Sequence, residues 1–380
     1  MTALRNRKVR LQEMANEPLR VMVVDDSAVA RGFIRRWLEL EQGIEIVASL
    51  RTGREALDYL DRADPDVVLL DVAMPDMDGI TALPLLLSKK PGLAVIMAST
   101  LTRRNAEVTL RALSLGALDC IQKPEAQGAI TTESYRQALV AKIRELGARA
   151  RRALVPGGMP RPVPSRRTAT GPETSAKTFS LRAPARTKPR VLLIGASTGG
   201  PQALDQVCSG LGPVIDEIPI LITQHMPPTF TTILAEHLGR ATGRLALEAE
   251  DGEPIRAGRI YVAPGHRHLK IARTNGQPVA VLDDSPPVHF CKPSVDVMFS
   301  SAAEVFGGSV LGVVLTGMGT DGTRGSSDIV AAGGGIIGQD EPTSIVWGMP
   351  GGVAQAGLCC LVLPLPDIAP AIVSAFGRRA

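Results

Sequence analysis

The chain has 380 residues and a formal net charge of +4, with 44% hydrophobic and 21% charged residues. This length favours two domains over one, and the composition is that of an ordinary globular protein rather than a disordered or fibrous one. Aromatic residues make up only 3%, too few for a surface that stacks the bases of single-stranded nucleic acid.

The chain carries no signal for a membrane or an oxidising compartment. No apolar run reaches the length of a membrane span, and residues 1–18 lack the apolar centre of a signal peptide. The five cysteines show no metal-type Cys-x-x-Cys spacing. We therefore expect a cytoplasmic protein without direct membrane insertion, whose thiols are free or buried.

Four apolar segments of the N-terminal half indicate buried strands, and each ends in polar residues. These segments are LRVMVVDDS (19–27), DVVLLDVAMPDMDG (66–79), LAVIMAST (93–100) and LDCIQKP (118–124). Helical patterns separate them, for example at 82–90 and 106–116. Such alternation predicts a parallel sheet with helices on both faces.

Acids at these strand ends predict a divalent-cation site. In a parallel sheet the functional edge lies at the carboxyl ends of the strands, so Asp25, Asp26 and Asp71 should converge there. Three adjacent carboxylates need a counter-charge, and Mg²⁺ would supply it through oxygen ligands. One carboxylate is then a candidate nucleophile toward a phosphoryl donor. The other polar residues at this edge are one cation and two hydroxyls: Lys123, Ser99 and Thr100.

The motifs VVDDS, DVAMPDMDG, MAST and QKP resemble those of bacterial response-regulator receiver domains. The resemblance covers residues 19–146 and implies a flavodoxin-like fold. It also implies that Asp71 accepts phosphate from a histidine kinase with the help of Mg²⁺. The residues that match the family's metal-binding positions are Asp25, Asp26, Asp71 and Ala73, the last through its carbonyl. Those that match its switch positions are Ser99, a better match than Thr100, and Lys123.

The segment between the two halves has a composition typical of a linker. Residues 149–190 hold eleven Lys or Arg and a single acid, Glu173, which gives the segment a charge of +10 and leaves −6 for the rest of the chain. The segment is also rich in Pro and Gly, so it cannot bury a core. We expect a tether over 147–188. An additional attraction to an acidic partner or membrane surface is the alternative.

The C-terminal half, 189–380, shows a second alternation of strands and helices. Strand patterns occur at 190–197, 219–226, 259–265, 310–322, 334–340 and 360–364, and helical patterns at 233–240 and 328–334. Residues 267–282 instead contain two short apolar runs around Asn275-Gly276, a strong hairpin signal. We expect a Rossmann-like doubly wound domain, mainly parallel, with an antiparallel hairpin.

The glycine-rich turn GASTGG (195–200) admits two interpretations. A phosphate-binding turn would need a further glycine at position 197 or a Gly-Lys-Ser/Thr sequence, and neither is present. A nucleophile turn needs Gly-x-Ser-x-Gly directly after a strand, and Ser197 satisfies it. This short pattern occurs often by chance, and a serine in such a turn is commonly a helix cap.

The partners of Ser197 favour the nucleophile. A serine needs an adjacent base, and the base needs an orienting carboxylate. QHMP places His225 at a strand end, and TGMGTDG places Asp321 just beyond another. The chain order Ser, His, Asp differs from that of α/β-hydrolases, which implies a different fold. Each of the three residues could also have a purely structural role, such as a helix cap, a hydrogen-bonded histidine or a turn residue. The other histidines are also candidates for the base. His237 is expected at the surface, His266 and His268 lie beside a turn and could line a groove, and the last is His289.

The motifs GASTGGP, QHMP, YVAPG, CKPSVDVMF and LTGMGTDG, in this order, resemble the catalytic domain of chemotaxis protein-glutamate methylesterases. An N-terminal receiver joined by a linker is that family's arrangement. The resemblance implies that Ser197 is the nucleophile, His225 the base and Asp321 its orienter. It gives supporting roles to Thr198 and to the backbone at Met318, a candidate oxyanion donor.

The implied reaction is hydrolysis of γ-glutamyl methyl esters on a chemoreceptor's helical cytoplasmic domain, with deamidation of receptor glutamines as a second activity. It requires no cofactor in the esterase domain. We further expect that the unphosphorylated receiver limits access to the esterase site. Two rivals remain: an output domain that only binds a partner, and a nucleic-acid-binding regulator. No DNA-reading motif is apparent for the second.

Overall fold

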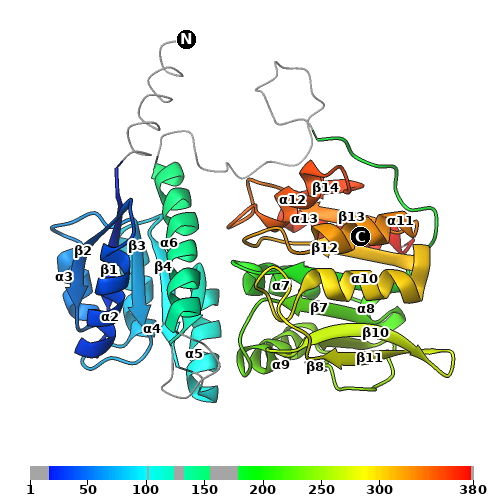
Figure 1. Cartoon of the computed structure of the whole chain (residues 1–380), viewed down its shortest axis with the longest axis horizontal. Helices are drawn as coiled ribbons and strands as arrows, with labels where there is room; N and C mark the ends of the chain where they lie inside the picture. The colour runs from blue at the N-terminus through cyan, green and yellow to red at the C-terminus, as the bar shows by residue number, and fades with distance from the viewer. Residues whose placement is uncertain (1–16, 101, 124–131, 155–178, 378–380) are drawn as a thin grey trace, which may run out of the picture. The chain divides into compact units, whose positions relative to one another are not determined.

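The computed structural model describes residues 17–100, 102–123, 132–154 and 179–377, which form two compact units (Figure 1). Each unit is built on its own parallel sheet. Residues 1–16 and most of the expected linker, 155–178, lie outside the described residues. No described helix is long and apolar enough to cross a membrane.

The first unit contains a five-stranded parallel sheet in the order β2-β1-β3-β4-β5. This is the flavodoxin-like order, so the predicted fold is confirmed. The central strands β3 and β4 are buried at every position, which explains their nearly continuous apolar sequences. The strands are β1 (Leu19–Val24), β2 (Ile44–Leu50), β3 (Val67–Asp71), β4 (Ala94–Ser99) and β5 (Asp119–Gln122).

Helices cover both faces of this sheet, and short polar side chains begin four of them. The hydroxyl of Ser27 accepts a hydrogen bond from the Ala30 N–H at 3.2 Å, and Thr52, Asp78 and Thr102 cap their helices in the same way. α2 packs against α6, and α4 packs against α3 and α5. The helices are α2 (Ala28–Glu39), α3 (Gly53–Tyr59), α4 (Gly79–Lys89), α5 (Arg103–Ser114) and α6 (Thr132–Leu154).

The last helix of this unit extends into the segment expected to be linker. α6 continues to Leu154, whereas the linker was expected from residue 147. Arg151, on this extension, is 8% exposed, and its guanidinium binds Asp66 at 2.7 Å and the carbonyl of Glu17 at 2.7 Å. A buried ion pair with the body of the unit therefore holds the arginine-rich end of the helix in place.

The second unit contains a seven-stranded parallel sheet in the order β14-β13-β12-β6-β7-β9-β8. β6, β7, β12 and β13 are buried at every position. The expected doubly wound fold is confirmed. The strands are β6 (Val191–Ala196), β7 (Ile220–Gln224), β8 (Leu245–Glu248), β9 (Arg259–Val262), β12 (Val310–Val314), β13 (Gly335–Gln339) and β14 (Leu361–Leu363).

The predicted hairpin forms a separate two-stranded sheet, β10 (His268–Thr274) and β11 (Gln277–Asp283), joined by Asn275 and Gly276 with positive φ. It packs on α10 rather than extending the main sheet, and the Ile271 N–H donates to Ser301 Oγ at 3.0 Å. α10 contacts α11, and α7 contacts α13. The helices are α7 (Gly200–Ser209), α8 (Val214–Glu217), α9 (Phe230–Thr242), α10 (Val295–Phe306), α11 (Thr323–Ala331), α12 (Met349–Gln355) and α13 (Leu365–Ala375).

Candidate active sites

In the first unit, the predicted acids converge at the carboxyl edge of the sheet. Asp71 is the last residue of β3, and Asp25 directly follows β1. Carboxylate oxygens of Asp25, Asp26 and Asp71 all lie within 4.8 Å of one another. The ammonium of Lys123, which directly follows β5, lies 2.6 Å from Asp25 Oδ2 and 2.8 Å from Asp71 Oδ2.

The charge balance of this cluster is incomplete without a further cation. Burial raises the pKa of Asp71, Lys123 lowers it, and Asp25 raises it again, so the net change is upward. Lys123 pairs with two of the three carboxylates, those of Asp25 and Asp71, and both of these are buried. Three carboxylates at this spacing are hard oxygen ligands, so the donor set fits Mg²⁺.

The remaining predicted receiver residues lie beside this cluster. Ser99, the last residue of β4, is 1% exposed and donates to the Thr100 carbonyl at 3.2 Å. The Thr100 hydroxyl accepts from the Asn105 side-chain amide at 2.7 Å, so it is occupied at the start of α5. Ala73 lies exposed in the loop after β3, where only its backbone is available as a ligand.

In the second unit, the candidate residues lie at the topological switch point of the sheet. β6 is flanked by β7 on one side and β12 on the other, and in such sheets the crevice lies outside the strand carboxyl ends. Ser197 directly follows β6, His225 directly follows β7, and Asp321 lies between β12 and α11. The register pairs Ala196 with Gln224, so Ser197 and His225 each come one residue after a paired position.

Close packing shapes the turn that carries Ser197. Gly199 has φ +75°, which favours glycine, and a Cβ on Gly200 would lie 1.9 Å from Gln224 Oε1. The amide nitrogen of Gln224 donates to the Ser197 carbonyl at 2.9 Å. On the other side, the Ser197 N–H donates to the Thr316 carbonyl at 3.0 Å. Both neighbouring strands therefore hold the serine turn.

His225 and Asp321 form a close pair, with Nε2 of the ring 2.8 Å from Oδ2 of the carboxylate. Since an ionised carboxylate only accepts, Nε2 carries the proton that faces Asp321, and Nδ1 is the ring nitrogen on the other side, where Cys291 also hydrogen-bonds the ring. Within the described residues no hydrogen bond joins the Ser197 hydroxyl to this ring. Such contacts are often long before substrate binds.

Asp321 is 1% exposed and lies against the N-terminus of α10. Burial raises its pKa, but His225 and two backbone N–H groups outweigh that effect and leave the pKa below its ordinary value. The helix N-terminus favours the negative charge as well. Besides the His225 ring, the donors to the carboxylate are Ser294 Oγ and the N–H groups of Val295, Asp296 and Gly322, all at 2.7–3.0 Å.

The two predicted supporting residues lie next to Ser197. Thr198 is 2% exposed, and its carbonyl accepts from the Thr316 hydroxyl at 2.9 Å. Met318 follows Gly317, where an added Cβ would lie 3.0 Å from the Ser197 nitrogen. The Met318 backbone therefore lies close to the serine turn, and its role as an oxyanion donor stays a prediction.

These two sites can be compared with known proteins. Residues 192–372 match the family model described as CheB methylesterase, and residues 21–134 match that of the response regulator receiver domain. A Rhodopseudomonas palustris protein named "Protein-glutamate methylesterase/protein-glutamine glutaminase of group 2 operon" is 56% identical over 370 residues, 95% of each chain. A Nitrobacter hamburgensis relative named "Protein-glutamate methylesterase/protein-glutamine glutaminase" is 57% identical over 366 residues, 95% of this chain and 94% of the relative.

The chain belongs to the CheB methylesterase family. Both resemblances stated from the motifs are therefore confirmed at the level of the family. The crystal structure of the Thermotoga maritima CheB methylesterase catalytic domain is 38% identical, with a TM-score of 0.48, and the match covers 50% of this chain and 99% of that chain.

Within this CheB methylesterase domain, one residue at the site was not predicted from the sequence. The sulfur of Cys291, a ring nitrogen of His225 and a carboxylate oxygen of Asp321 all lie within 4.8 Å of one another. Burial lowers the pKa of His225, but Cys291 and Asp321 outweigh it and raise the pKa above its ordinary value. Cys291 lies inside the motif CKPSVDVMF, so the motif was a signal, but a lone cysteine gave no reason to single it out.

The structure gives the other candidate histidines surroundings of their own. His237 lies half-exposed on α9 and pairs with Asp205 at 2.9 Å. His268 is fully buried, and its ring binds the Ser294 N–H and the Pro286 carbonyl, so it holds the start of α10. Burial and Lys292 lower the pKa of His266.

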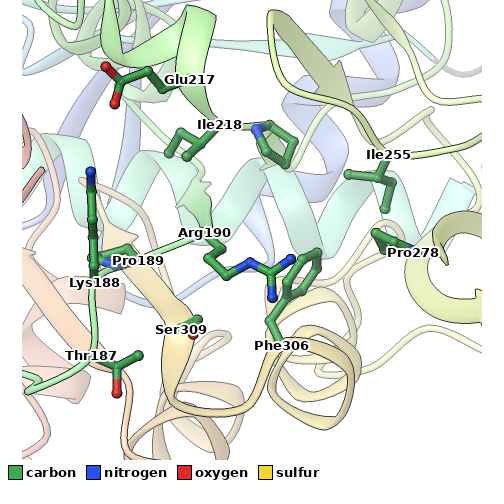
Figure 2. A pocket seen from close by; sticks show the side chains of 11 residues that line it. Thr187, Lys188, Pro189, Arg190, Glu217, Ile218, Ile255, Pro278, Phe306 and Ser309 are labelled. Carbon is green, nitrogen blue, oxygen red and sulfur yellow. The ribbon is translucent and has the colours of Figure 1, made fainter. Parts of the chain in front are cut away.

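A cavity of about 640 Å³ in this domain lies at the opposite edge of the sheet (Figure 2). Its lining includes residues 187–190, 217–219 and 309, which directly precede β6, β7 and β12. Figure 2 shows the Arg190 side chain extending toward Phe306 across this cavity. Because it opens at the amino ends of the strands, it is separate from the Ser197 edge.

Proposed function

We propose that this chain hydrolyses γ-glutamyl methyl esters on the cytoplasmic helices of a chemoreceptor, with release of methanol. Ser197 is the nucleophile, His225 the base and Asp321 the orienting carboxylate. The observation that carries the proposal is the 2.8 Å His225–Asp321 pair at the switch point, one strand from Ser197. The names of the relatives, which pair methylesterase with glutaminase, support deamidation of receptor glutamines as a second activity.

The proposed reaction proceeds in two halves. The Ser197 oxygen attacks the ester carbonyl while its proton moves to Nδ1 of His225. The proton then passes to the methoxide, and methanol leaves an acyl-enzyme. Water gives a proton to the same nitrogen, attacks the acyl carbon and restores glutamate and free serine. With a glutamine substrate the leaving group is ammonia, which departs less readily.

Asp321 and the glycine-rich turns supply the electrostatics of the proposed reaction. The buried carboxylate keeps the proton on Nε2 and stabilises the imidazolium that forms. The developing oxyanion would be bound by backbone N–H groups such as that of Met318. Each such donor contributes about 3–4 kcal/mol in enzymes of this type.

The decisive test is methanol release from a methylated receptor fragment, with wild type and Ser197→Ala compared at equal concentration. We expect release from wild type and background release from the variant. Equal release from both would refute the nucleophile and favour a role in partner binding. Hydrolysis of a small activated ester should follow the same pattern.

We further propose that phosphorylation of Asp71 by a histidine kinase controls this activity. Asp25, Asp26 and Asp71 would hold Mg²⁺, which neutralises the incoming phosphoryl oxygens, and Lys123 would bind them as a point charge. Ser99, buried beside the cluster, would donate its hydroxyl to the phosphoryl group. We infer this control because the receiver and the esterase domain lie in one chain, and phosphorylation of a receiver typically changes the conformation of the domain that it controls.

In the proposed gate, the unphosphorylated receiver limits access to the esterase site, and phosphorylation shifts the population toward an open form. A small phosphodonor should therefore raise methanol release by wild type and leave Asp71→Asn unchanged. Identical responses of the two proteins would refute the gate without touching the triad.

A further inference from the structure

A tight turn beside the esterase site combines two unfavourable features. Residues 288–291 form a two-residue turn in which the Cys291 N–H donates to the Val288 carbonyl at 2.8 Å, and the Val288 N–H donates back at 3.1 Å. Its central residues, His289 and Phe290, have φ of +50° and +61°. Turns with two positive φ angles favour Asn-Gly, because bulky side chains are crowded in this conformation.

The ring of Phe290 is also almost entirely in water. It is 99% exposed, more than any other large apolar side chain among the described residues, the next being Leu40 at 75%. A strained backbone and an exposed aromatic ring at the same position both cost stability. Such outliers cluster at binding and catalytic sites, where the strain serves function.

The turn is fixed to the catalytic residues on both sides of Phe290. On one side, Cys291 lies within the 4.8 Å cluster that includes His225 and Asp321. On the other, His289 Nε2 lies 3.3 Å from a carboxylate oxygen of Asp296 in the first turn of α10, the helix end that binds Asp321. The backbone of Phe290 is therefore held at a defined position on the rim of the site.

We propose that Phe290 is a binding residue for the protein substrate, which packs an apolar side chain of the receptor helix against the ring. The inference rests on the proposed function. Phe290 is the residue next to Cys291, so its Cα lies about 3.8 Å from that of Cys291, a member of the cluster with His225 and Asp321. On a helix the same-face neighbours of the ester-bearing residue lie about 5–6 Å away, at positions three or four along.

The occupant is thus an aliphatic or aromatic residue one helical turn from the ester-bearing glutamate. Aromatic anchors of this kind dominate the energetics of protein–protein contacts, and truncating one typically weakens binding about tenfold or more. A small ester reaches the same nucleophile without covering the ring. The contribution of Phe290 should therefore appear as selectivity for the receptor over a small ester.

The test uses the full-length protein with a small phosphodonor and two substrates, a methylated receptor fragment and p-nitrophenyl acetate. In Phe290→Ala, the ratio of kcat/KM for the receptor to kcat/KM for the small ester should fall about tenfold, mainly through a higher KM. Phe290→Leu should recover most of the ratio. Leu245→Ala, at a half-exposed leucine that begins β8, is the matched control and should leave the ratio unchanged.

The variant Phe290→Gly distinguishes a role of the ring in substrate binding from a role in the stability of the domain. Glycine adopts positive φ without crowding, so this variant should unfold at a higher temperature and still lose the receptor preference. A ring that only stabilises the domain predicts the opposite, a lower unfolding temperature and equal losses on both esters.

Three results would overturn the proposal: an unchanged ratio in Phe290→Ala, higher activity of that variant without phosphodonor, or an altered oligomeric state. The second would assign the ring to the receiver and the third to another copy of the chain. Failure of the proposed function would give a different result from failure of this proposal, because wild type would then release no more methanol from the receptor fragment than Ser197→Ala does.

Discussion

Replacement of Asp321 by asparagine should nearly abolish activity and weaken the catalytic domain. Oδ1 accepts three hydrogen bonds and Oδ2 accepts two, from the Val295 N–H and His225 Nε2. The side-chain NH₂ of the introduced asparagine has to replace one oxygen, and the less costly choice is Oδ2. It then faces the Val295 N–H and forces Nε2 of His225 to become an acceptor.

The loss of activity and the loss of stability can each be estimated. With Nε2 as acceptor, Nδ1 carries the proton and cannot take one from Ser197, a tautomer error that costs about 10⁴-fold in kcat in serine proteases. One buried N–H without a partner costs about 1–3 kcal/mol, and the lost charge-assisted bond adds a similar amount. We therefore expect a loss of about 2–6 kcal/mol in the free energy of unfolding.

The stability loss should depend on pH in a defined direction. The folded-state pKa of Asp321 is lowered, so its stabilising effect is full above the unfolded-state value of about 3.9 and is lost as pH falls through the folded-state pKa. The difference between wild type and Asp321→Asn should therefore shrink below about pH 4.

The assay combines methanol release with urea unfolding. The chain has two tryptophans, and a Trp37→Phe background leaves Trp347 as the fluorophore, which reports on the esterase domain. Asp205→Asn is the matched control, because Asp205 also meets a histidine at 2.9 Å but is half-exposed. Activity of Asp321→Asn within tenfold of wild type would refute the tautomer argument.

Three further changes test neighbouring features. Cys291→Ala should lower the pKa of the site histidine, so that the acidic limb of the kcat–pH profile moves to lower pH; a shift the other way would exclude this electrostatic role. Gly200→Ala places a Cβ against the Gln224 amide 1.9 Å away, and kcat for a small ester should fall more than about tenfold in a folded protein. Arg151→Met leaves Asp66 buried without its guanidinium, and receiver unfolding in urea should show a loss of about 3–5 kcal/mol.

The parallel sheets were predictable because their central strands are buried on both faces and therefore appear as continuous apolar runs. Two edge strands were not identified from the sequence. β2 (IEIVASL) has one buried residue, Ala48, and carries the exposed Glu45 and Ser49, and β8 is only four residues long with an exposed Leu245. Neither strand has the apolar run that marked the others.

Contacts between distant segments also could not be predicted from local sequence patterns. The extension of α6 depends on Asp66, 85 residues before Arg151, so its arginine-rich sequence resembled a linker. The strained turn at 288–291 carries His and Phe at its centre rather than Asn and Gly, so no turn signal was present. Sequence patterns register local preference, whereas these features arise from tertiary contacts that override it.

The N-terminus of α10 connects these features of the esterase domain. Asp296, in its first turn, donates its N–H to Asp321 and directs its buried carboxylate toward His289. The same helix end therefore fixes the carboxylate that orients His225 and the turn that presents Phe290. Because packed interiors transmit displacements rather than absorb them, the proposed base and the backbone that carries the proposed substrate-binding ring should keep a constant separation. A substrate helix that contacts the ring is then aligned with the base in the same step, which is how binding energy remote from the ester can lower the barrier of the reaction.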